Sequence, residues 1–340
     1  MTGGSGFLGV NLIRRLLDNG YSVVTFDREA FRSSDARPVE VVMGDIRDAE
    51  ALSRAVAGCA AVIHCAAALP LHSPAEIWQV DVEGTRNVVE AAIAAKVERF
   101  IHISSTAVYG VGQPPGFAED GLLLAEGPYG RAKIESERVI EGCRGDIAAA
   151  ILRPQSIIGP ERLGLFSLLF DWAHTGHNFP ILGRGTNRYQ FVDVDDLCDA
   201  IAACLKVPKS DMNGTFNIGA ASFGTFRSDF QALLTHAGHG KRVLSLPRLP
   251  ALSMLRLLSA LRLSPIYPWV FESAVLDNFV STEKAERILV WKPRFSNVDA
   301  LIRNYDWYKE HIDDFDSNGG KTHRVPWRQG ALTLAKWFFR

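Results

Sequence analysis

A tyrosine and a lysine stand four residues apart in the stretch "YGRAK", at Tyr129 and Lys133. At this spacing the two side chains share one face of a helix. A phenol has a reference pKa of about 10 and is a poor base near neutral pH, but a neighbouring ammonium group favours the phenolate and lowers that pKa. The pair therefore predicts a tyrosine that takes the proton of a substrate hydroxyl.

Hydroxyl side chains precede this pair in "ISSTAVYG" (103–110), at the end of an apolar run that predicts a strand. Ligands of a doubly wound sheet bind at the carboxyl ends of its strands. We therefore expect Ser105 to hydrogen-bond the reacting oxygen and Thr106 to belong to the same substrate site.

The chain opens with "MTGGSGFLG", in which Gly3, Gly6 and Gly9 have the spacing G-x-x-G-x-x-G. Because glycine has no side chain, backbone N–H groups here can approach a pyrophosphate at the N-terminus of the helix that follows. We expect Phe7 and Leu8, the first residues of that helix, to complete the site. The motif predicts a dinucleotide cofactor.

An acidic residue, Asp27, ends the next predicted strand about 20 residues further on, where a carboxylate can accept both ribose hydroxyls of an adenosine. A carboxylate at this place also repels a 2′-phosphate, which favours NAD over NADP. Arg28 keeps NADP open as an alternative, since an adjacent arginine can receive a 2′-phosphate.

Two further stretches suit the rest of the cofactor. In "GDIRD" (44–48) we expect Asp45 and Ile46 to bracket the adenine. In "CAAALP" (65–70) the small residues Ala66 and Ala67 allow a cofactor to lie close to the backbone.

These residues need a parallel sheet to position them, and the first 150 residues supply its pattern. Short β-branched runs cover 21–26, 39–44, 60–65, 99–104 and 148–154, and segments with helical spacing cover 7–19, 48–57, 75–96 and 129–143. The alternation predicts an α/β fold with a Rossmann-like, doubly wound parallel sheet that is covered on both faces.

Beyond residue 160 the alternation loosens, although a helix at 193–205 and a strand at 214–219 look like a return to the sheet. We predict an NAD-binding Rossmann domain over 1–159, joined by 193–219; a smaller, mostly helical substrate lobe over 160–192 and 220–310; and a C-terminal tail over 311–340.

The first strand of this fold is short of residues, because only Met1 and Thr2 precede the glycine motif. In a doubly wound sheet this strand is central, and its absence leaves buried backbone groups unpaired. We therefore expect the strand to be truncated, with about four to eight further apolar residues upstream.

The composition narrows the class of protein. A net charge of −1 gives no electrostatic footprint for nucleic acid. The five cysteines form no C-x-x-C pair and predict a reducing compartment, and no basic segment followed by an apolar run opens the chain. We expect a cytoplasmic homodimer.

Other segments carry two interpretations each. The apolar segment 249–270 carries Arg256 and Arg262 and is broken by proline, so it is either a helix of the lobe or a surface that contacts a membrane or lipid. Segment 330–340 ends in an aromatic pair with flanking cations, and it either packs on the body or a second subunit or lies in a membrane interface. The pairs His174/His177 and His236/His239 lack nearby carboxylate or cysteine partners, so we expect no metal site.

The order of these motifs, continued by "LRP", "GP" and "FVDVDDL", resembles the extended short-chain dehydrogenase/reductase superfamily, and within it the NAD-dependent epimerase/dehydratase group that acts on nucleotide sugars. The likeness runs from residue 2 to about 310. It implies that Tyr129 is the general base, that Lys133 holds the nicotinamide ribose, and that Ser105, four residues before Tyr109, orients the substrate hydroxyl.

The sequence also departs from the pattern of that group. Thr106 and Ala107 stand where sugar dehydratases carry an Asp-Glu pair, so dehydration is not expected. Ser156 stands where nucleotide-sugar enzymes often have an Asn that holds the diphosphate, and Arg188, their diphosphate-binding arginine by position, is displaced by one residue. Asp81 replaces the usual Asn of N-V-x-G-T.

The main hypothesis is therefore an NAD-dependent sugar epimerase-type enzyme, which oxidises a secondary alcohol of a (nucleotide-)sugar to a transient ketone. An alternative is a 3β-hydroxysteroid-dehydrogenase-like oxidoreductase on a lipid alcohol, favoured by segment 249–270. A third, non-catalytic NAD-binding regulator of the same fold is disfavoured by the intact set of Ser105, Tyr129 and Lys133.

Overall fold

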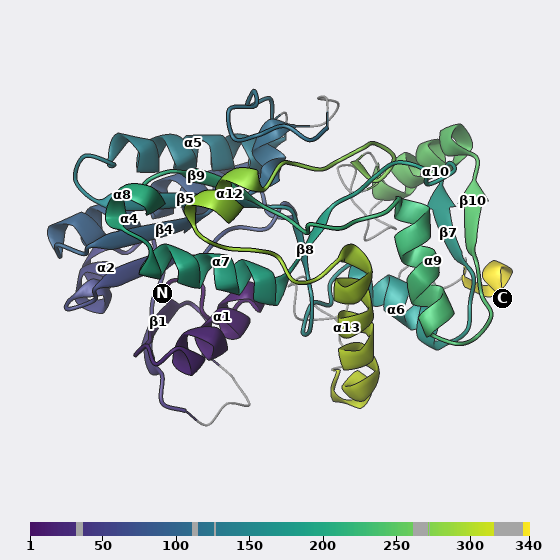
Figure 1. The fold of residues 1–340 in the computed structure, drawn as a ribbon, viewed down its shortest axis with the longest axis horizontal. Helices are drawn as coiled ribbons and strands as arrows, with labels where there is room; N and C mark the ends of the chain where they lie inside the picture. The colour runs from purple at the N-terminus through teal and green to yellow at the C-terminus, as the bar shows by residue number, and fades with distance from the viewer. Residues whose placement is uncertain (32–36, 111–114, 126, 261–270, 272, 316–335) are drawn as a thin grey trace. The chain divides into compact units, whose positions relative to one another are not determined.

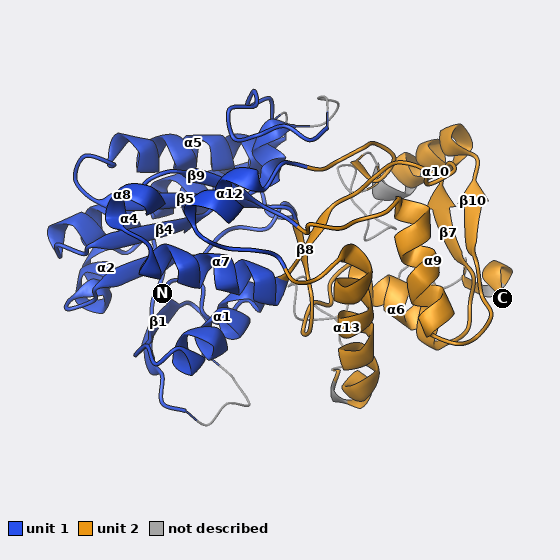
Figure 2. Cartoon of the chain, in the orientation of Figure 1, with its two compact units in different colours: residues 1–155, 194–219, 280–293 blue, residues 156–193, 220–279, 294–340 orange. Residues whose placement is uncertain are grey.

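The computed structural model describes residues 1–31, 37–110, 115–125, 127–260, 271, 273–315 and 336–340 (Figure 1). The chain forms two compact units, which are described separately (Figure 2). The first unit contains residues 1–155, 194–219 and 280–293, and the second contains 156–193, 220–279 and 294–340.

The first unit is built on parallel strands. β3 (Ala61–His64), β4 (Arg99–Ile103), β5 (Ala148–Pro154) and β9 (Thr215–Ile218) form a four-stranded parallel sheet in that order, and β1 (Val24–Asp27) pairs with β2 (Glu40–Met43), also in parallel. Each strand coincides with an apolar run of the sequence. The predicted doubly wound α/β fold is confirmed.

The place between β1 and β3 is held by residues 1–3. Thr2 forms parallel bridges with both Phe26 and His64. The Thr2 and Gly3 N–H groups donate to the Ile63 and Phe26 carbonyls, each at 3.0 Å, and Met1 and Thr2 accept from Phe26 and Cys65 at 2.8 and 3.2 Å. At the position expected for this strand, Thr2 thus bridges the strand pair β1–β2 to the four-stranded sheet.

Helices cover both faces of this sheet (Figure 1). One layer contains α1 (Phe7–Asp18) and α7 (Val194–Lys206), which pack on each other. The other contains α2 (Ala49–Val56), α3 (Pro74–Trp78), the π-helical turn η1 (Gln79–Gly84), α4 (Thr85–Ala94) and α5 (Pro128–Gly142). The helix expected over 75–96 is therefore interrupted, and the interruption carries Asp81.

Apolar side chains of the strands and of this second layer form one core. Phe100 and Ile151 from the sheet pack with Leu52, Val88 and Ile140 from the helices, and all five are fully buried. These residues recur at strand and helix periods in the sequence, which explains why the alternating pattern predicts the layers.

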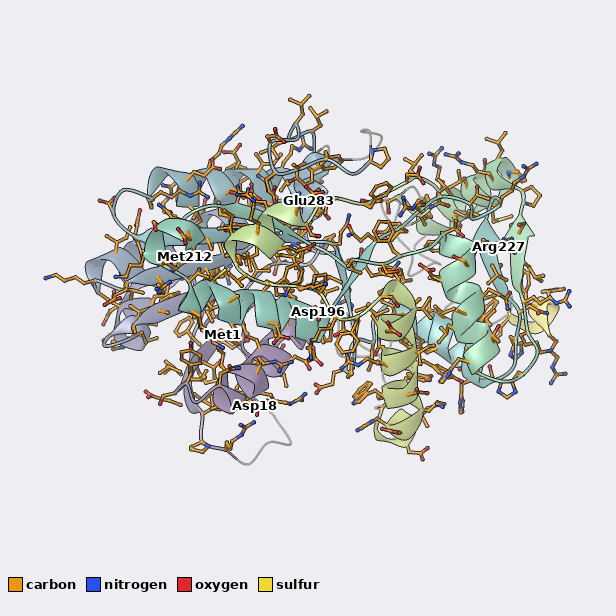
Figure 3. All side chains as sticks on the ribbon, in the orientation of Figure 1. Met1, Asp18, Asp196, Met212, Arg227 and Glu283 are labelled. Atoms are coloured by element: carbon orange, nitrogen blue, oxygen red, sulfur yellow. The ribbon has the colours of Figure 1, made fainter. Side chains whose placement is uncertain are left out.

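The first unit also contains a segment that the sequence analysis assigns to the lobe. This segment, residues 280–293, includes α12 (Glu283–Ile288). A further short helix of the first unit, α8 (Lys209–Met212), precedes β9. Val280 bridges to Phe117, and the Trp291 indole donates to the backbone oxygen of Asp196 on α7 at 2.9 Å (Asp196 is labelled in Figure 3).

The second unit combines helices with two short parallel pairs of strands. β6 (Ser156–Ile158) pairs with β8 (Phe191–Asp193), and β7 (Phe179–Leu182) pairs with β10 (Val243–Leu246). The helices are α6 (Phe166–His174), α9 (Phe226–His236), α10 (Arg248–Ala260) and α13 (Asn297–Glu310), followed by the 3₁₀ turns η3 (Ile312–Asp314) and η4 (Trp337–Phe339). Its core is rich in aromatic side chains, among them Phe170, Phe230 and Tyr305.

The described end of the C-terminal tail packs on this unit. The Phe339 ring lies 5.7 Å from the Trp172 ring on α6, and Lys336 forms an ion pair with Asp171 at 2.5 Å. Of the predicted segment 249–270, residues 261–270 lie outside the described residues. Among the helices that the structure describes, none has the length and apolar character needed to cross a bilayer.

Candidate active site

The glycine motif forms a tight turn that joins residues 1–3, which lie between β1 and β3, to helix α1. Gly3 has a φ of +72°, and a Cβ there would lie 2.6 Å from the Ala66 nitrogen. A Cβ on Gly9 would lie 2.3 Å from the Gly3 carbonyl oxygen, so its absence lets the first turn of α1 press against the loop. Gly3 and Gly9 must therefore be glycine for the loop to pack closely against the first turn of α1 and against Ala66.

The N-terminus of α1 suits an anion. Gly6 is the N-cap residue and provides no side-chain cap, and the first turn carries no acidic side chain. Phe7 is buried and Leu8 half-buried, so the first turn is anchored in the core. The helix dipole and backbone N–H groups at this end favour a phosphate group.

Asp27 lies at the end of β1, beside this loop. Its carboxylate accepts from the backbone N–H groups of Ser5 at 2.9 Å and Glu29 at 3.1 Å. Both bonds fix the side chain where the sequence analysis expects the ribose acceptor.

Of the two residues expected at the adenine, Asp45 forms an ion pair at the surface and Ile46 is buried. Asp45 is paired with Arg47, which the sequence analysis does not single out, at 2.5 and 2.9 Å, and Arg28 lies 3.9 Å away. The hydrogen bond with Arg47 lowers the pKa of Asp45, so this carboxylate stays ionised. Ile46 is buried under Gly84, where an added Cβ would lie 2.5 Å from its Cδ1.

Ala66 and Ala67 follow β3 after Cys65. Ala66 contacts Gly3 through the close approach described above, and its N–H donates to Thr2 Oγ1 at 3.4 Å. Ala67 is exposed.

Tyr129 and Lys133 come together at the start of α5. Pro128 occupies the first turn of this helix, and a Cβ on Gly130 would lie 2.9 Å from the Ala107 carbonyl oxygen, so the helix packs closely on the turn that follows β4. Lys133 is buried, and its Nζ lies 5.7 Å from the centroid of the half-buried Tyr129 ring.

The Lys133 ammonium has two further neighbours. It donates to the Ile103 carbonyl oxygen at 3.3 Å and lies 3.4 Å from Asp81 Oδ1. Burial by itself lowers the pKa of this lysine, but the charges of Asp81 and Tyr129 oppose it and the net pKa is raised. Lys133 is therefore a buried cation next to the phenol.

Ser105 is the better placed of the two adjacent serines. It is half-buried, and its Oγ accepts from the Ala107 N–H at 3.1 Å as the cap of the 3₁₀ turn η2 (Thr106–Tyr109). Its own hydrogen is not used in that bond. Ser104 is instead buried and donates to Glu137 at 2.5 Å, and Thr106 donates to Gln155 at 3.1 Å.

A buried polar network that the sequence analysis misses supports this turn. Arg153 on β5 binds Glu137 on α5 at 2.6 and 2.9 Å, and donates to Tyr109 Oη at 2.8 Å. Tyr109 in turn donates to Asn217 on β9 at 2.7 Å. The network ties two strands and a helix together beneath the hydroxyl residues.

Ser156 and Arg188, expected at the substrate, lie in the second unit. Ser156 Oγ is 3.1 Å from Tyr189 Oη. The exposed Arg188 guanidinium lies between two aromatic rings, 4.6 Å from the centroid of Phe223 and 4.7 Å from that of Phe279. Within the described part of the chain, no carboxylate comes within ion-pair distance of it.

Comparison with known proteins shows the family of this chain. The model of the "NAD dependent epimerase/dehydratase family" matches residues 1–219. The chain belongs to this family. Its members are NAD-dependent enzymes, so NAD is the cofactor.

Individual relatives fall into different groups. The chain is similar to the "uncharacterized protein y4nG" of Sinorhizobium fredii, with 34% identity over 100% of this chain and 86% of that protein. It is also similar to "3 beta-hydroxysteroid dehydrogenase/Delta 5-->4-isomerase" of Mycobacterium tuberculosis, with 29% identity over 91% of this chain and 89% of that protein.

Among solved structures, the fold resembles the UDP-glucuronic acid 4-epimerase from Bacillus cereus in complex with NAD. The TM-score is 0.74 at 23% identity, over 91% of this chain and 97% of that chain.

The residues present in this chain fit NAD. The two glycine cradle positions, the uncapped N-terminus of α1 and the fixed carboxylate of Asp27 follow one another along one end of the sheet. They match a pyrophosphate and an adenosine ribose without a 2′-phosphate.

Proposed function

We propose that this family member is a sugar epimerase-type enzyme that oxidises a secondary alcohol of a (nucleotide-)sugar to a transient ketone. The observation that carries the proposal is the pairing of Tyr129 with the buried, charged Lys133 on α5, the helix that packs on the η2 turn capped by Ser105. A phenol needs such a cation to act as a base near neutral pH.

NAD supplies the hydride acceptor when it is bound. Tyr129 takes the proton of the substrate hydroxyl, and the Lys133 cation stabilises the phenolate form that accepts it. Ser105 donates its hydrogen to the reacting oxygen and holds it near the tyrosine. When the ketone is reduced on its other face, Tyr129 returns the proton to the oxygen, so proton and hydride balance over the cycle.

Arg188 supports a phosphate-bearing substrate. Stacking between Phe223 and Phe279 holds the guanidinium in one orientation and reduces the entropy that it loses on binding an anion. We propose that Arg188, with Ser156, binds the diphosphate of a nucleotide sugar.

A second candidate, a dehydrogenase acting on a sterol-like alcohol, is favoured by the steroid dehydrogenase relative and by the surface of α10. Leu249, Met254 and Leu257 on this helix are 78%, 56% and 55% exposed. In this alternative, α10 contacts a membrane surface peripherally. The homodimer and the cytoplasmic location stay predictions from the sequence.

The experiment that separates the candidates is a screen of UDP-sugars and sterols with purified protein and NAD. A sugar epimerase converts its substrate with no net change in NADH absorbance. Stoichiometric NADH release from a sterol, with no sugar converted, would refute the epimerase and establish the alternative.

Tyr129→Phe tests the base in the same assay. We expect turnover to fall at least a hundredfold, because the substitution deletes the proton acceptor, while the Kd of NAD stays nearly unchanged. Tyr21→Phe, outside the site, is the matched control. Retention of more than a tenth of wild-type activity would show that another group is the base.

A further inference from the structure

Asp81 is a buried carboxylate in the π-helical turn η1, with few partners for its charge. Oδ1 accepts from the Ala68 N–H at 3.2 Å and lies 3.4 Å from Lys133 Nζ. Oδ2 is buried and has no hydrogen-bond partner among the described residues. Burial makes this carboxylate costly to ionise, and the ion pair with Lys133 offsets only part of that cost. The presence of a charged pair at this place therefore asks for a functional reason.

The turn that carries Asp81 is anchored to the sheet. Thr85 Oγ1 donates to the Asp81 backbone oxygen at 2.7 Å, and His64 Nε2 on β3 lies 2.9 Å from the same Thr85 oxygen. These bonds hold the backbone of Asp81 in place relative to β3. The carboxylate therefore reaches Lys133 from an element that is anchored to the sheet.

The other titratable groups near this pair do not replace Asp81. They are Tyr129 and Glu137 on α5, His64 on β3, Cys65 directly after it, His102 on β4 and His72 before α3. Glu137 is bonded to Arg153 and Ser104. Burial lowers the pKa of both His64 and His102, so these rings are neutral, and burial raises the pKa of Cys65 to about 12.

We propose that Asp81 is a positioning residue, the counter-ion that keeps Lys133 protonated and holds its ammonium beside Tyr129. Asp81 and the Ile103 carbonyl take two of the three ammonium hydrogens, and the third is left for a ligand or the phenolate. Without an anion, a buried lysine loses its proton at a lower pH. The inference rests on the proposed role of Tyr129 as the base.

The first test is Asp81→Asn, which keeps an oxygen for the Ala68 N–H and removes the charge. We expect the alkaline limb of the profile of kcat/KM against pH to move down by about one unit or more, because Lys133 then deprotonates earlier. Asp196→Asn, at a buried carboxylate on α7, should leave the profile in place. A uniform loss of activity with an unmoved profile would reduce Asp81 to a packing role and overturn the proposal.

A second test needs no substrate and remains valid if the sugar assignment fails. Lys133→Met leaves Asp81 buried without its cation, so the urea midpoint at pH 7 should fall. Adding Asp81→Asn to that variant should then restore most of the lost midpoint, because the unpaired charge is gone. Strictly additive effects of the two substitutions would show that the residues do not act as a pair.

Discussion

Acid should destabilise this protein through a histidine buried beside the cofactor loop. His64 is 1% exposed. Its Nδ1 lies 2.7 Å from Thr2 Oγ1, and its Nε2 lies 2.9 Å from Thr85 Oγ1. Thr85 donates its own hydrogen to the Asp81 carbonyl, so Nε2 donates to Thr85 and the neutral ring is satisfied on both sides. Burial, and next the charge of Lys133, lower the pKa of His64 to about 3.

The sign and size follow from proton binding in the two states. Between pH 3 and the ordinary histidine pKa of 6.5, the unfolded chain binds a proton on His64 that the folded protein does not. The free energy of unfolding therefore falls as the pH falls, by up to about 1.4 kcal/mol for each unit. From pH 6.5 to pH 4 the loss through His64 is about 3 kcal/mol, a large part of the 5–15 kcal/mol that is typical of a folded protein.

Urea unfolding measured from pH 7 to pH 4 checks this. The variant His64→Gln should show a slope against pH that is shallower by about 1 kcal/mol per unit than that of the wild type, whatever its stability at pH 7. The same measurement on His239→Gln, at an exposed histidine outside the site, is the control. An equal slope in wild type and His64→Gln would refute the idea that the folded protein excludes this proton.

Two further predictions concern the cofactor. Asp27→Ala should weaken NAD more than NADP, because it removes the ribose acceptor together with its repulsion of a 2′-phosphate; calorimetry gives both Kd values, and an unchanged ratio would assign the preference to Arg28 or another residue. Gly9→Ala should weaken NAD at least tenfold, because its Cβ would meet the Gly3 oxygen at 2.3 Å. Gly142→Ala, whose Cβ meets nothing within 4 Å, should leave the Kd as it is.

Much of the first unit follows from local sequence. The strand runs and the glycine motif are contiguous, and each is specified by apolar periodicity or by the absence of side chains at fixed positions. Tyr129 and Lys133 are one helical turn apart, so their proximity is also a local property. These features can therefore be predicted from short stretches of sequence, without knowing which distant segments pack together.

Other features depend on which segments the sheet brings together. Tyr109 and Asn217 are 108 positions apart, yet they share a hydrogen bond because η2 follows β4 and Asn217 lies on β9 of the same sheet. Residues 280–293 belong to the first unit, but their sequence has no apolar strand pattern that would predict this. The sequence shows Asp81 only as a departure from a motif.

The pairing of Asp81 with Lys133 shows where local sequence stops being sufficient. Their residue types are visible in the chain, but the charge of each depends on burial and on the other, and both are set by packing of η1 against α5. Desolvation and Coulomb interactions act through space, so only the tertiary structure decides that this lysine remains a cation. The sequence by itself determined the cofactor motif and the Tyr129/Lys133 pair proposed as the base; the fold decided the electrostatic environment of that pair.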